Sequence, residues 1–309
     1  MWGFPRHKPQ FFSRSRTALA SAAMYYSFGR RIPRSSHFLI AASILAPGVG
    51  RLLIEGCRFA PSCGWDVWQE IEANSKELRG APNHWVFFQS QWKVQPFSAF
   101  PINRFGRARG FVHVCNIGHT PFHPSMKGTT FRVPRLRDEY RIRDWRIGIY
   151  EPLPRLHRAT CWDAKVVGDL VHEISLSLEP NLEKPRSLPL HWRPIHGDLT
   201  PTNLRTDHRN RLWLIDWEHA AWGPPAADLL YFASAIRSMK KESPSALADW
   251  IRGNVRVPDA ELSEAATFWL GHEHLQVSSG NERSATKGKA ADIRRGQKLS
   301  AAFRLLAQS

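Results

Sequence analysis

The sequence predicts an α+β fold in which a strand-rich part is followed by a mainly helical part. Strand-like apolar segments gather between residues 84 and 150. After residue 163 the apolar residues recur at helical spacing, and no internal repeat is visible. Strands that are grouped together before the helices, rather than alternating with them, are typical of the α+β class.

Three segments predict a small antiparallel sheet. They are residues 85–88 (WVFF), 111–115 (FVHVC) and 140–150, and all are rich in β-branched and aromatic side chains. A helix is expected just before them at residues 64–78, with its apolar side formed by Trp65, Trp68 and Ile71.

The helical part is predicted to begin at Asp163, because an aspartate before a helix can accept hydrogen bonds from its first N–H groups. The apolar stripe of this helix consists of Val167, Leu170, Val171, Ile174 and Leu178. A linker with several prolines follows at residues 180–194. Further helices are expected from Ala226, at residues 259–275, and in a basic C-terminal segment after a polar break at residues 278–289.

Residues 1–36 are basic and rich in serine, and the first acidic residue of the chain is Glu55. We expect a poorly ordered arm there; a transit peptide, or a start codon assigned too early with Met24 as a later candidate, are the alternatives. Residues 38–54 are apolar but contain Pro47 and Arg51, so they predict a docked helix rather than a membrane span.

Composition places further bounds on the protein. The chain has 309 residues, of which 42% are hydrophobic, so a sizeable core is expected. Its net charge is +16, yet the charge is spread along the chain without a zinc finger, a basic zipper or an RNA-binding aromatic motif, which disfavours nucleic-acid binding. The four cysteines show no metal spacing and predict reduced thiols in a cytoplasmic protein.

The most informative segment runs from His196-Gly-Asp198-Leu-Thr-Pro-Thr-Asn203 to Leu212-Trp-Leu-Ile-Asp216. An apolar strand leads to Asp198, and a short hairpin of residues 204–206 and 211–215 would bring Asp216 back near Asn203. Mg²⁺ prefers oxygen ligands and needs only one or two carboxylates beside substrate phosphates. We therefore expect Asn203 and Asp216 to hold Mg²⁺, Asp198 to accept a hydrogen bond from a substrate hydroxyl, and His196 to brace the loop.

A second motif, Gly223-Pro-Pro-Ala-Ala-Asp228-Leu, precedes the helix expected from Ala226. Prolines suit a helix start, where a missing N–H costs nothing. Two roles remain open for Asp228: it either caps this helix or braces the loop that carries Asp198.

Together, these motifs and the sequence Ile215-Asp-Trp-Glu218 resemble the aminoglycoside phosphotransferase and choline kinase group, which is related to protein kinases. The resemblance is strong over residues 190–236 and weaker through residues 149–154. It implies a two-lobed, protein-kinase-like fold, with ATP and Mg²⁺ as cofactors. By position it implies that Asp198 is the catalytic base, that Asn203 and Asp216 are metal ligands, and that Tyr150 and Glu151 lie where the family holds adenine.

The sequence departs from that family in its phosphate-binding residues. His113 stands in the best strand, where the family has a lysine, and no acidic partner occurs between Glu77 and Asp138. Lys127 could reach the phosphates instead, and arginines 104, 107 and 109 are alternatives because arginine binds phosphate well.

We expect four parts: the arm at 1–36, a helical extension at 37–83, a small nucleotide-binding lobe at 84–150 and a large catalytic lobe at 151–309. The expected function is that of a small-molecule kinase, which transfers the γ-phosphoryl group of ATP to a hydroxyl. The alternative is a catalytically impaired nucleotide-binding or scaffold protein that lacks the lysine–glutamate pair. The sequence predicts neither the acceptor nor the oligomeric state.

Overall fold

The structure is a computed structural model. It describes residues 2–4, 11–13, 58–59, 70, 73–74, 84–89, 97–103, 108–116, 130–153, 156–157, 163–201, 203–207, 209, 211–238, 240, 242–272 and 287–308. The docked helix expected to end near Pro47 lies outside these residues, as does most of the helix expected at 64–78. No helix in the part described is both long enough and apolar enough to cross a membrane.

The chain divides into two compact units, each of which is described by itself. The sheet unit comprises Met1–Pro121, Pro134–His157 and Thr206–Arg209. The helical unit comprises Phe122–Val133, Arg158–Arg205 and Asn210–Ser309. A unit built on strands and a unit built on helices confirm the predicted α+β class, while the four-part division of the chain stays a prediction.

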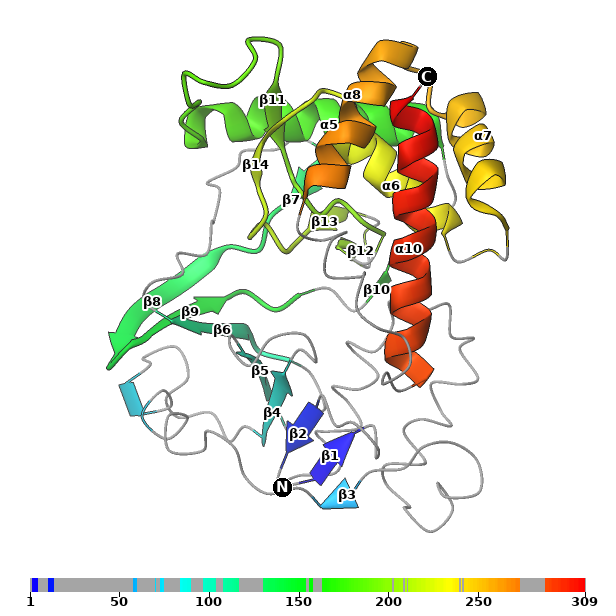
Figure 1. Ribbon diagram of the computed structural model, residues 1–309. Helices are drawn as coiled ribbons and strands as arrows, with labels where there is room; N and C mark the ends of the chain where they lie inside the picture. Colours follow the sequence, from blue (N-terminus) through cyan, green and yellow to red (C-terminus); the bar gives the residue numbers. More distant parts are fainter. Residues whose placement is uncertain are drawn as a thin grey trace. The chain divides into compact units, whose positions relative to one another are not determined.

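The sheet unit contains an eight-stranded sheet in which neighbouring strands pair antiparallel (Figure 1). Its strands, in spatial order, are β3 (Arg58–Phe59), β1 (Trp2–Phe4), β2 (Phe11–Ser13), β4 (His84–Gln89), β5 (Phe97–Ile102), β6 (Phe111–Asn116), β9 (Trp145–Tyr150) and β8 (Leu136–Ile142). A further short strand, β10, spans Leu156–His157. Strands β1 and β2 fall within the arm expected at residues 1–36.

Strands β4 and β6 match two of the three segments predicted from the sequence. The third, residues 140–150, proves to be a hairpin, because β8 ends at Ile142 and pairs with Trp145 across a two-residue turn. Arg143 in that turn has a φ of 52°. Tight hairpin turns require a positive φ, but arginine is not a residue type that predicts one. Strand β5 was not predicted, since Pro101 lies within it.

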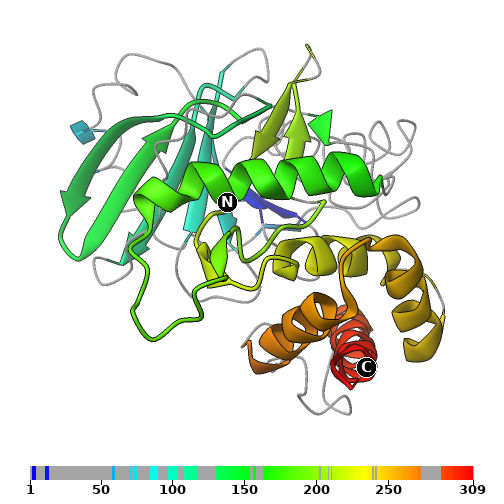
Figure 2. The same cartoon turned by 90° about the horizontal axis from the view of Figure 1, so that it is seen from above.

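The helical unit is built from helices and short strands (Figures 1 and 2). The helices are α5 (Ala164–Leu178), the 3-10 turn η1 (Glu179–Asn181), α6 (Ala227–Arg237), α7 (Pro244–Asn254), α8 (Asp259–Gly271) and α10 (Lys287–Ala307). The strands are β7 (Phe131–Arg132), β11 (Arg193–Ile195), β12 (Leu204–Thr206), β13 (Leu212–Leu214) and β14 (Ala221–Gly223). Strands β12, β13 and β7 are successive neighbours in one sheet, and β11 pairs with β14 in another.

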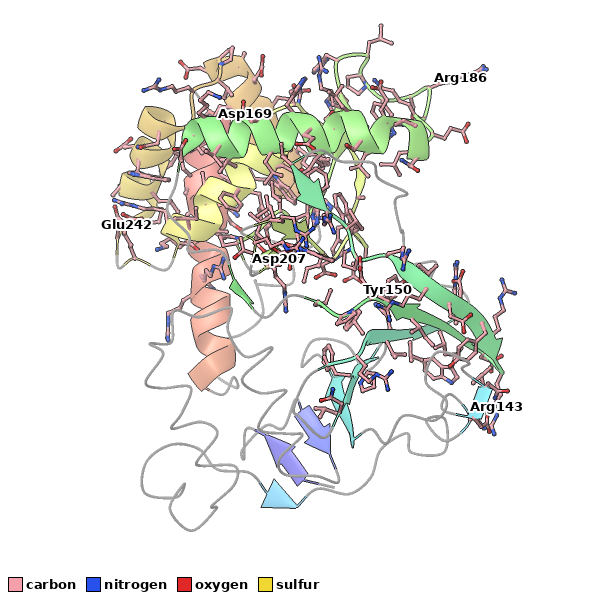
Figure 3. All side chains as sticks on the ribbon, turned by 180° about the vertical axis from the view of Figure 1, so that it is seen from behind. Arg143, Tyr150, Asp169, Arg186, Asp207 and Glu242 are labelled. Carbon is pink, nitrogen blue, oxygen red and sulfur yellow. The ribbon has the colours of Figure 1, made fainter. Side chains whose placement is uncertain are left out.

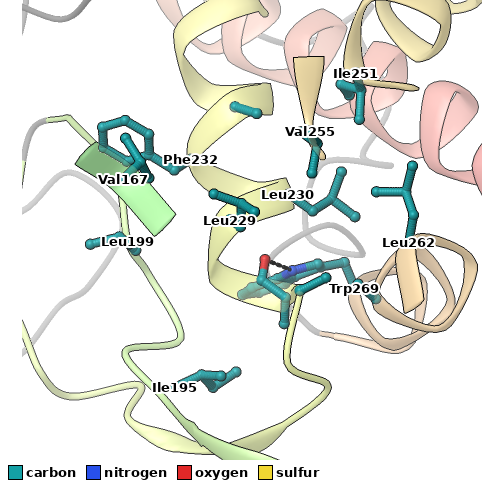
Figure 4. Packing of buried hydrophobic residues seen from close by; sticks show 14 of the residues in the cluster. Val167, Ile195, Leu199, Leu229, Leu230, Phe232, Ile251, Val255, Leu262 and Trp269 are labelled. Carbon is teal, nitrogen blue, oxygen red and sulfur yellow. Dashed lines mark hydrogen bonds between the residues drawn. The ribbon is translucent and has the colours of Figure 1, made fainter. Parts of the chain in front are cut away.

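One hydrophobic core joins these helices to the strands (Figure 4). Leu230 of α6, Ile251 of α7 and Phe303 of α10 are fully buried in it. Helix α8 contributes Trp269, whose Nε1 donates to the Ala227 carbonyl at 2.8 Å, the bond drawn in Figure 4. A hydrogen bond from α8 therefore fixes the beginning of α6. This matters because the motif that contains Asp228 lies there.

Helices α5, α6, α8 and α10 match the helices predicted from the sequence. Helix α7 was not predicted, although its start carries two signals: the Ser243 hydroxyl accepts from Ala246 N at 3.1 Å, and Pro244 occupies the first turn. Only Leu247, Ala248 and Ile251 of this helix are buried, so its apolar pattern is short.

The start of α5 provides a test of how a single capping residue stabilises the helical unit. The Asp163 carboxylate accepts from Lys165 N at 3.0 Å and Val166 N at 3.1 Å. We expect Asp163→Ala to lower the free energy of unfolding by about 1 kcal/mol, measured by urea denaturation. Asp169→Ala, which removes an exposed carboxylate from the same helix, should have a much smaller effect; equal losses would contradict the capping role.

Candidate active site

The candidate site is carried by two strand pairs of the helical unit. Strand β11 pairs with β14 antiparallel, so that Ile195 faces Ala221, and the chain leaves β11 directly into His196. Strand β13 lies parallel to β7, with Leu212 opposite Phe131. Thr130, which directly precedes β7, donates both its N–H and its hydroxyl to the Glu173 carboxylate of α5. These strands place residues 196–203 and 215–219 in one region.

His196 is completely buried and bonds to both of these segments. Its Nδ1 accepts from Asp198 N at 3.2 Å, so its Nε2 carries the hydrogen and donates to the Ile215 carbonyl at 3.0 Å. Its ring also lies 4.5 Å from that of Trp217. Burial lowers the pKa of His196 to about 3, so this histidine is a neutral connection between the loop and the end of β13.

Asp228, the second residue of α6, is also fully buried. Its carboxylate accepts from His196 N at 2.6 Å and from Gly197 N at 3.1 Å. Burial raises the pKa of Asp228 to about 6, and these two hydrogen bonds oppose the rise. Asp228 therefore braces the loop through these contacts. The residue that precedes α6 is Ala226, and no side-chain hydrogen bond caps the helix there.

Gly197 makes the turn between His196 and Asp198 possible. Its φ is +78°, and a Cβ at this position would lie 1.9 Å from the His219 carbonyl oxygen. Glycine is the residue that adopts such a φ without steric cost. The loop and the segment after Asp216 therefore pack backbone against backbone at this point.

Asp198 and Asn203 are directly hydrogen bonded. Asn203 Nδ2 donates at 2.9 Å both to the Asp198 carbonyl and to Asp198 Oδ2. Asn203 also binds through its backbone carbonyl, which accepts from Ile215 N at 3.1 Å. The amide thus fixes one oxygen of Asp198 and lies beside the residue that precedes Asp216.

Asp216 has a φ of +71°, a left-handed conformation that aspartate tolerates better than most residues. The next residue, Trp217, is buried, and its Nε1 donates to the Leu214 carbonyl at 3.2 Å. Its ring contacts that of Phe131 at 6.1 Å. Trp217 anchors the chain immediately after the turn, and Asp216 is thereby held at the end of β13.

The two carboxylates influence each other electrostatically. Burial, and then the charge of Asp216, raise the pKa of Asp198 to about 7, while the hydrogen bond from Asn203 opposes the rise. Glu218 and, more weakly, Asp198 and Asp216 raise the pKa of His219, while burial opposes the rise. The region therefore concentrates negative charge, which a bound cation would stabilise.

The donor atoms fit Mg²⁺. Asn203 uses Nδ2 for both of its contacts with Asp198, so its Oδ1 is the atom that could bind a cation. Asp216 supplies an anionic oxygen whose charge reaches Asp198. Mg²⁺ is usually held by one or two carboxylates together with substrate phosphates. Within the described residues there is no group of three or more His, Cys, Asp or Glu that could form a complete protein cage.

The nucleotide-binding residues expected from the sequence belong to the sheet unit. His113 is half-buried in β6 opposite Gly148, and Tyr150 is buried with its ring 6.0 Å from Phe111. The Glu151 carboxylate accepts from Arg135 N at 2.8 Å. Lys127, like the alternatives Arg104 and Arg107, lies outside the described residues, and Arg109 is exposed. Their roles stay predictions.

Two neighbours of the site were not anticipated from the sequence. His219 follows the Ile215–Glu218 motif, and Tyr231 follows Asp228 by almost one helical turn. Burial and the charge of Asp198 raise the pKa of Tyr231, so its hydroxyl lies within electrostatic reach of the loop. The i, i+3 spacing of Asp228 and Tyr231 was the available signal, because such residues share a helix face.

Gly197 provides a test of the loop geometry. We expect Gly197→Ala to lower the free energy of unfolding by more than about 2 kcal/mol, because it combines a strained φ with a backbone clash. Gly168→Ala in α5 is the matched control, since a Cβ there meets nothing within 4 Å and alanine favours a helix. Urea denaturation of both variants measures the difference, and similar stabilities would contradict the geometry.

His196 predicts a pH dependence of stability. Its folded-state pKa of about 3 is below the ordinary value of 6.5, so below pH 6.5 the unfolded chain binds a proton that the folded chain does not. The stabilising contribution of His196 is therefore complete above pH 6.5 and is lost as the pH falls toward 3, by roughly 1 kcal/mol per pH unit.

Urea unfolding of the wild type and of His196→Gln at several pH values from 7 to 4 tests this prediction. The advantage of the wild type over the variant should shrink as the pH falls, and the shared contributions of Asp198 and Asp228 cancel in the difference. Parallel stability curves would show that His196 titrates normally.

Residues 130–264 match the model of the phosphotransferase enzyme family. No curated protein sequence matches the chain. Similar solved structures include spectinomycin phosphotransferase APH(9)-Ia in complex with ADP and spectinomycin, which shares 11% identity and a TM-score of 0.49 over 81% of this chain and 99% of that one.

Two further similar structures are kinases. The choline/ethanolamine kinase family protein from Mesorhizobium loti shares 13% identity and a TM-score of 0.40 over 79% of this chain and 99% of that one. Choline kinase LicA from Streptococcus pneumoniae shares 10% identity and a TM-score of 0.40 over 78% and 98%, respectively. All three TM-scores are below 0.5, so these likenesses say nothing of this chain's substrate. The match includes Asp198, Asn203, Asp216 and Asp228 and confirms the resemblance predicted from the motifs: residues 130–264 are similar to the phosphotransferase enzyme family.

Proposed function

We propose that this protein is an ATP- and Mg²⁺-dependent phosphotransferase that transfers the γ-phosphoryl group to a hydroxyl of a small molecule. The observation that carries the proposal is the hydrogen bond of 2.9 Å from Asn203 Nδ2 to Asp198 Oδ2, on a loop that Asp228 braces. It joins a candidate base to a candidate metal ligand within a segment that matches the family model.

Asp198 would orient the acceptor. Because Asn203 holds Oδ2, Oδ1 is the oxygen that would accept a hydrogen bond from the substrate hydroxyl and take its proton as the new bond to phosphorus forms. Asp198 must be ionised for this role, and its raised pKa would be lowered by a cation near Asp216.

Asn203 Oδ1 and the Asp216 carboxylate would hold Mg²⁺. When bound, the ion supplies positive charge to the phosphate oxygens while the acceptor and leaving oxygens stand in line. His196 and Trp217 act through position: the first connects the loop to Ile215, and the second fixes the chain beside Asp216. This arrangement provides the positioning and electrostatic stabilisation on which phosphoryl transfer depends.

The second candidate is a nucleotide-binding or scaffold protein without turnover. It is favoured by His113, which stands in the middle of β6 where the resemblance implies a lysine. A thermal shift with ATP and Mg²⁺, combined with transfer assays over a broad panel of hydroxylated metabolites, separates the two. Binding without transfer to any acceptor supports this second candidate.

Substitutions in the two aspartates test the proposed enzyme. We expect Asp198→Asn to lower the rate of transfer from radiolabelled ATP by roughly 10² to 10⁴-fold, the usual contribution of a general base. Asp216→Asn should also lower this rate, and it should raise the Mg²⁺ concentration that half-maximal transfer requires. Asp198→Asn should not lower the free energy of unfolding, because it removes a carboxylate whose ionisation is opposed by burial and by Asp216.

Asp249→Asn, an exposed carboxylate of α7, is the control and should keep full activity. Wild-type activity in a folded Asp198→Asn or Asp216→Asn variant would remove the role assigned to that residue.

A further inference from the structure

Four cations gather where α6 ends, between that helix and α10. They are Arg237, Lys240, Arg295 and Lys298. Arg295 Nε donates to the Ser238 hydroxyl at 2.8 Å, and Lys298 Nζ donates to the Lys240 carbonyl at 2.7 Å. We call these four residues the basic cluster.

The negative charge at this place is too small to balance the basic cluster. Glu242, labelled in Figure 3 between α6 and α7, pairs with Arg237 Nε at 3.0 Å. Among the carboxylates that the structure describes, none lies within ion-pair distance of Lys240, Arg295 or Lys298. Burial and the charge of Arg295 lower the pKa of Lys298, whereas Glu242 opposes this effect. Three positive charges are thus held together at an electrostatic cost that an anion would relieve.

The basic cluster lies on the helix face that leads to the candidate active site. Asp228, Tyr231 and Ser238 follow one another at intervals of three and seven residues, so they share one face of α6. Asp228 holds the loop of Asp198 at one end of this face, and Ser238 binds Arg295 at the other, about 15 Å away along the axis. Tyr231, between them, is close enough to both Asp198 and Arg295 for each charge to affect the pKa of its hydroxyl.

Capping of α6 explains only part of the basic cluster. Cations in the last turn of a helix are stabilised by its free carbonyl groups, and Arg237 occupies such a position in α6. Lys298 binds the Lys240 carbonyl, which lies beyond the end of α6 and also accepts from Glu242 N at 3.0 Å. Arg295 instead binds a hydroxyl through Nε alone, and its two Nη groups have no hydrogen-bond partner among the described residues. A guanidinium presented in this way can bind the two oxygens of a phosphate or carboxylate.

We propose that Arg295, with Lys240 and Lys298, binds an anionic group, a phosphate or a carboxylate, on the hydroxylated acceptor that Asp198 activates. The acceptor is then an elongated molecule with a hydroxyl at one end and a negative charge near the other. This inference rests on the proposed phosphotransferase function and selects the class of its substrate.

Two measurements test the proposal. In the first, the full-length protein, labelled with ¹⁵N, is titrated with inorganic phosphate while the arginine Nε–H signals are followed by NMR. The Arg295 signal should shift with saturation in the wild type and in Arg294→Ala. In Arg295→Ala, which lacks this signal, the backbone amide signals that shift in the wild type are followed instead, and binding should weaken at least tenfold. Arg294 is the matched control because it is an exposed arginine on the same helix.

In the second measurement, transfer from ATP is assayed with pairs of alcohols that differ only in a phosphate or carboxylate group. The charged member of each pair should have at least a tenfold higher kcat/KM. Arg295→Ala should remove this preference through a higher KM for the acceptor, with the KM for ATP unchanged, and Arg295→Lys should restore part of it.

The outcomes separate the two proposals. Transfer that favours neutral or cationic alcohols, or that is insensitive to Arg295→Ala, overturns the anionic acceptor but leaves the phosphotransferase in place. Phosphate binding that depends on Arg295, without transfer to any acceptor, overturns the phosphotransferase and leaves the basic cluster as an anion site. If Arg295→Ala changes only the KM for ATP, the basic cluster binds the nucleotide, and the inference is wrong.

Discussion

The candidate site depends on the buried carboxylate of Asp228. It accepts the N–H groups of His196 and Gly197, which no strand or helix partner satisfies at this turn, and it does so from the first turn of a helix that the core holds firmly. A buried N–H without a partner would cost about 1–3 kcal/mol, so this one side chain determines whether the loop can stay in the interior. Asp198 follows that turn directly, and its N–H donates back to His196 Nδ1 at 3.2 Å.

Once the loop is in place, electrostatics decides its chemistry. Burial, and then the repulsion from Asp216, raise the pKa of Asp198. Asn203 relieves part of it by donating to Asp198. A divalent cation bound beside these carboxylates would offset the rest. At the far end of α6 the balance is reversed, because positive charge is in excess there.

Much of the helical unit was predictable because its signals are local. An aspartate at a helix start, an apolar stripe at helical spacing and an apolar run before Asp216 each depend on a few neighbouring residues. The elements that were missed, β5 and α7, have weak local patterns: one contains Pro101, and the other buries only three residues. The hairpin at Arg143 was missed because no glycine or asparagine marks its positive φ.

The sequence by itself predicted the family resemblance, the α+β class, and which aspartates and asparagine form the candidate site, because these follow from residue types at short fixed spacings. Only the tertiary structure decided what each side chain contacts. That Asp228 reaches back 32 residues to His196, that His196 is neutral, and that Arg295 lies at the end of α6 are results of long-range packing. No local pattern encodes such contacts, since the burial and the charges that produce them come from segments far apart in the chain.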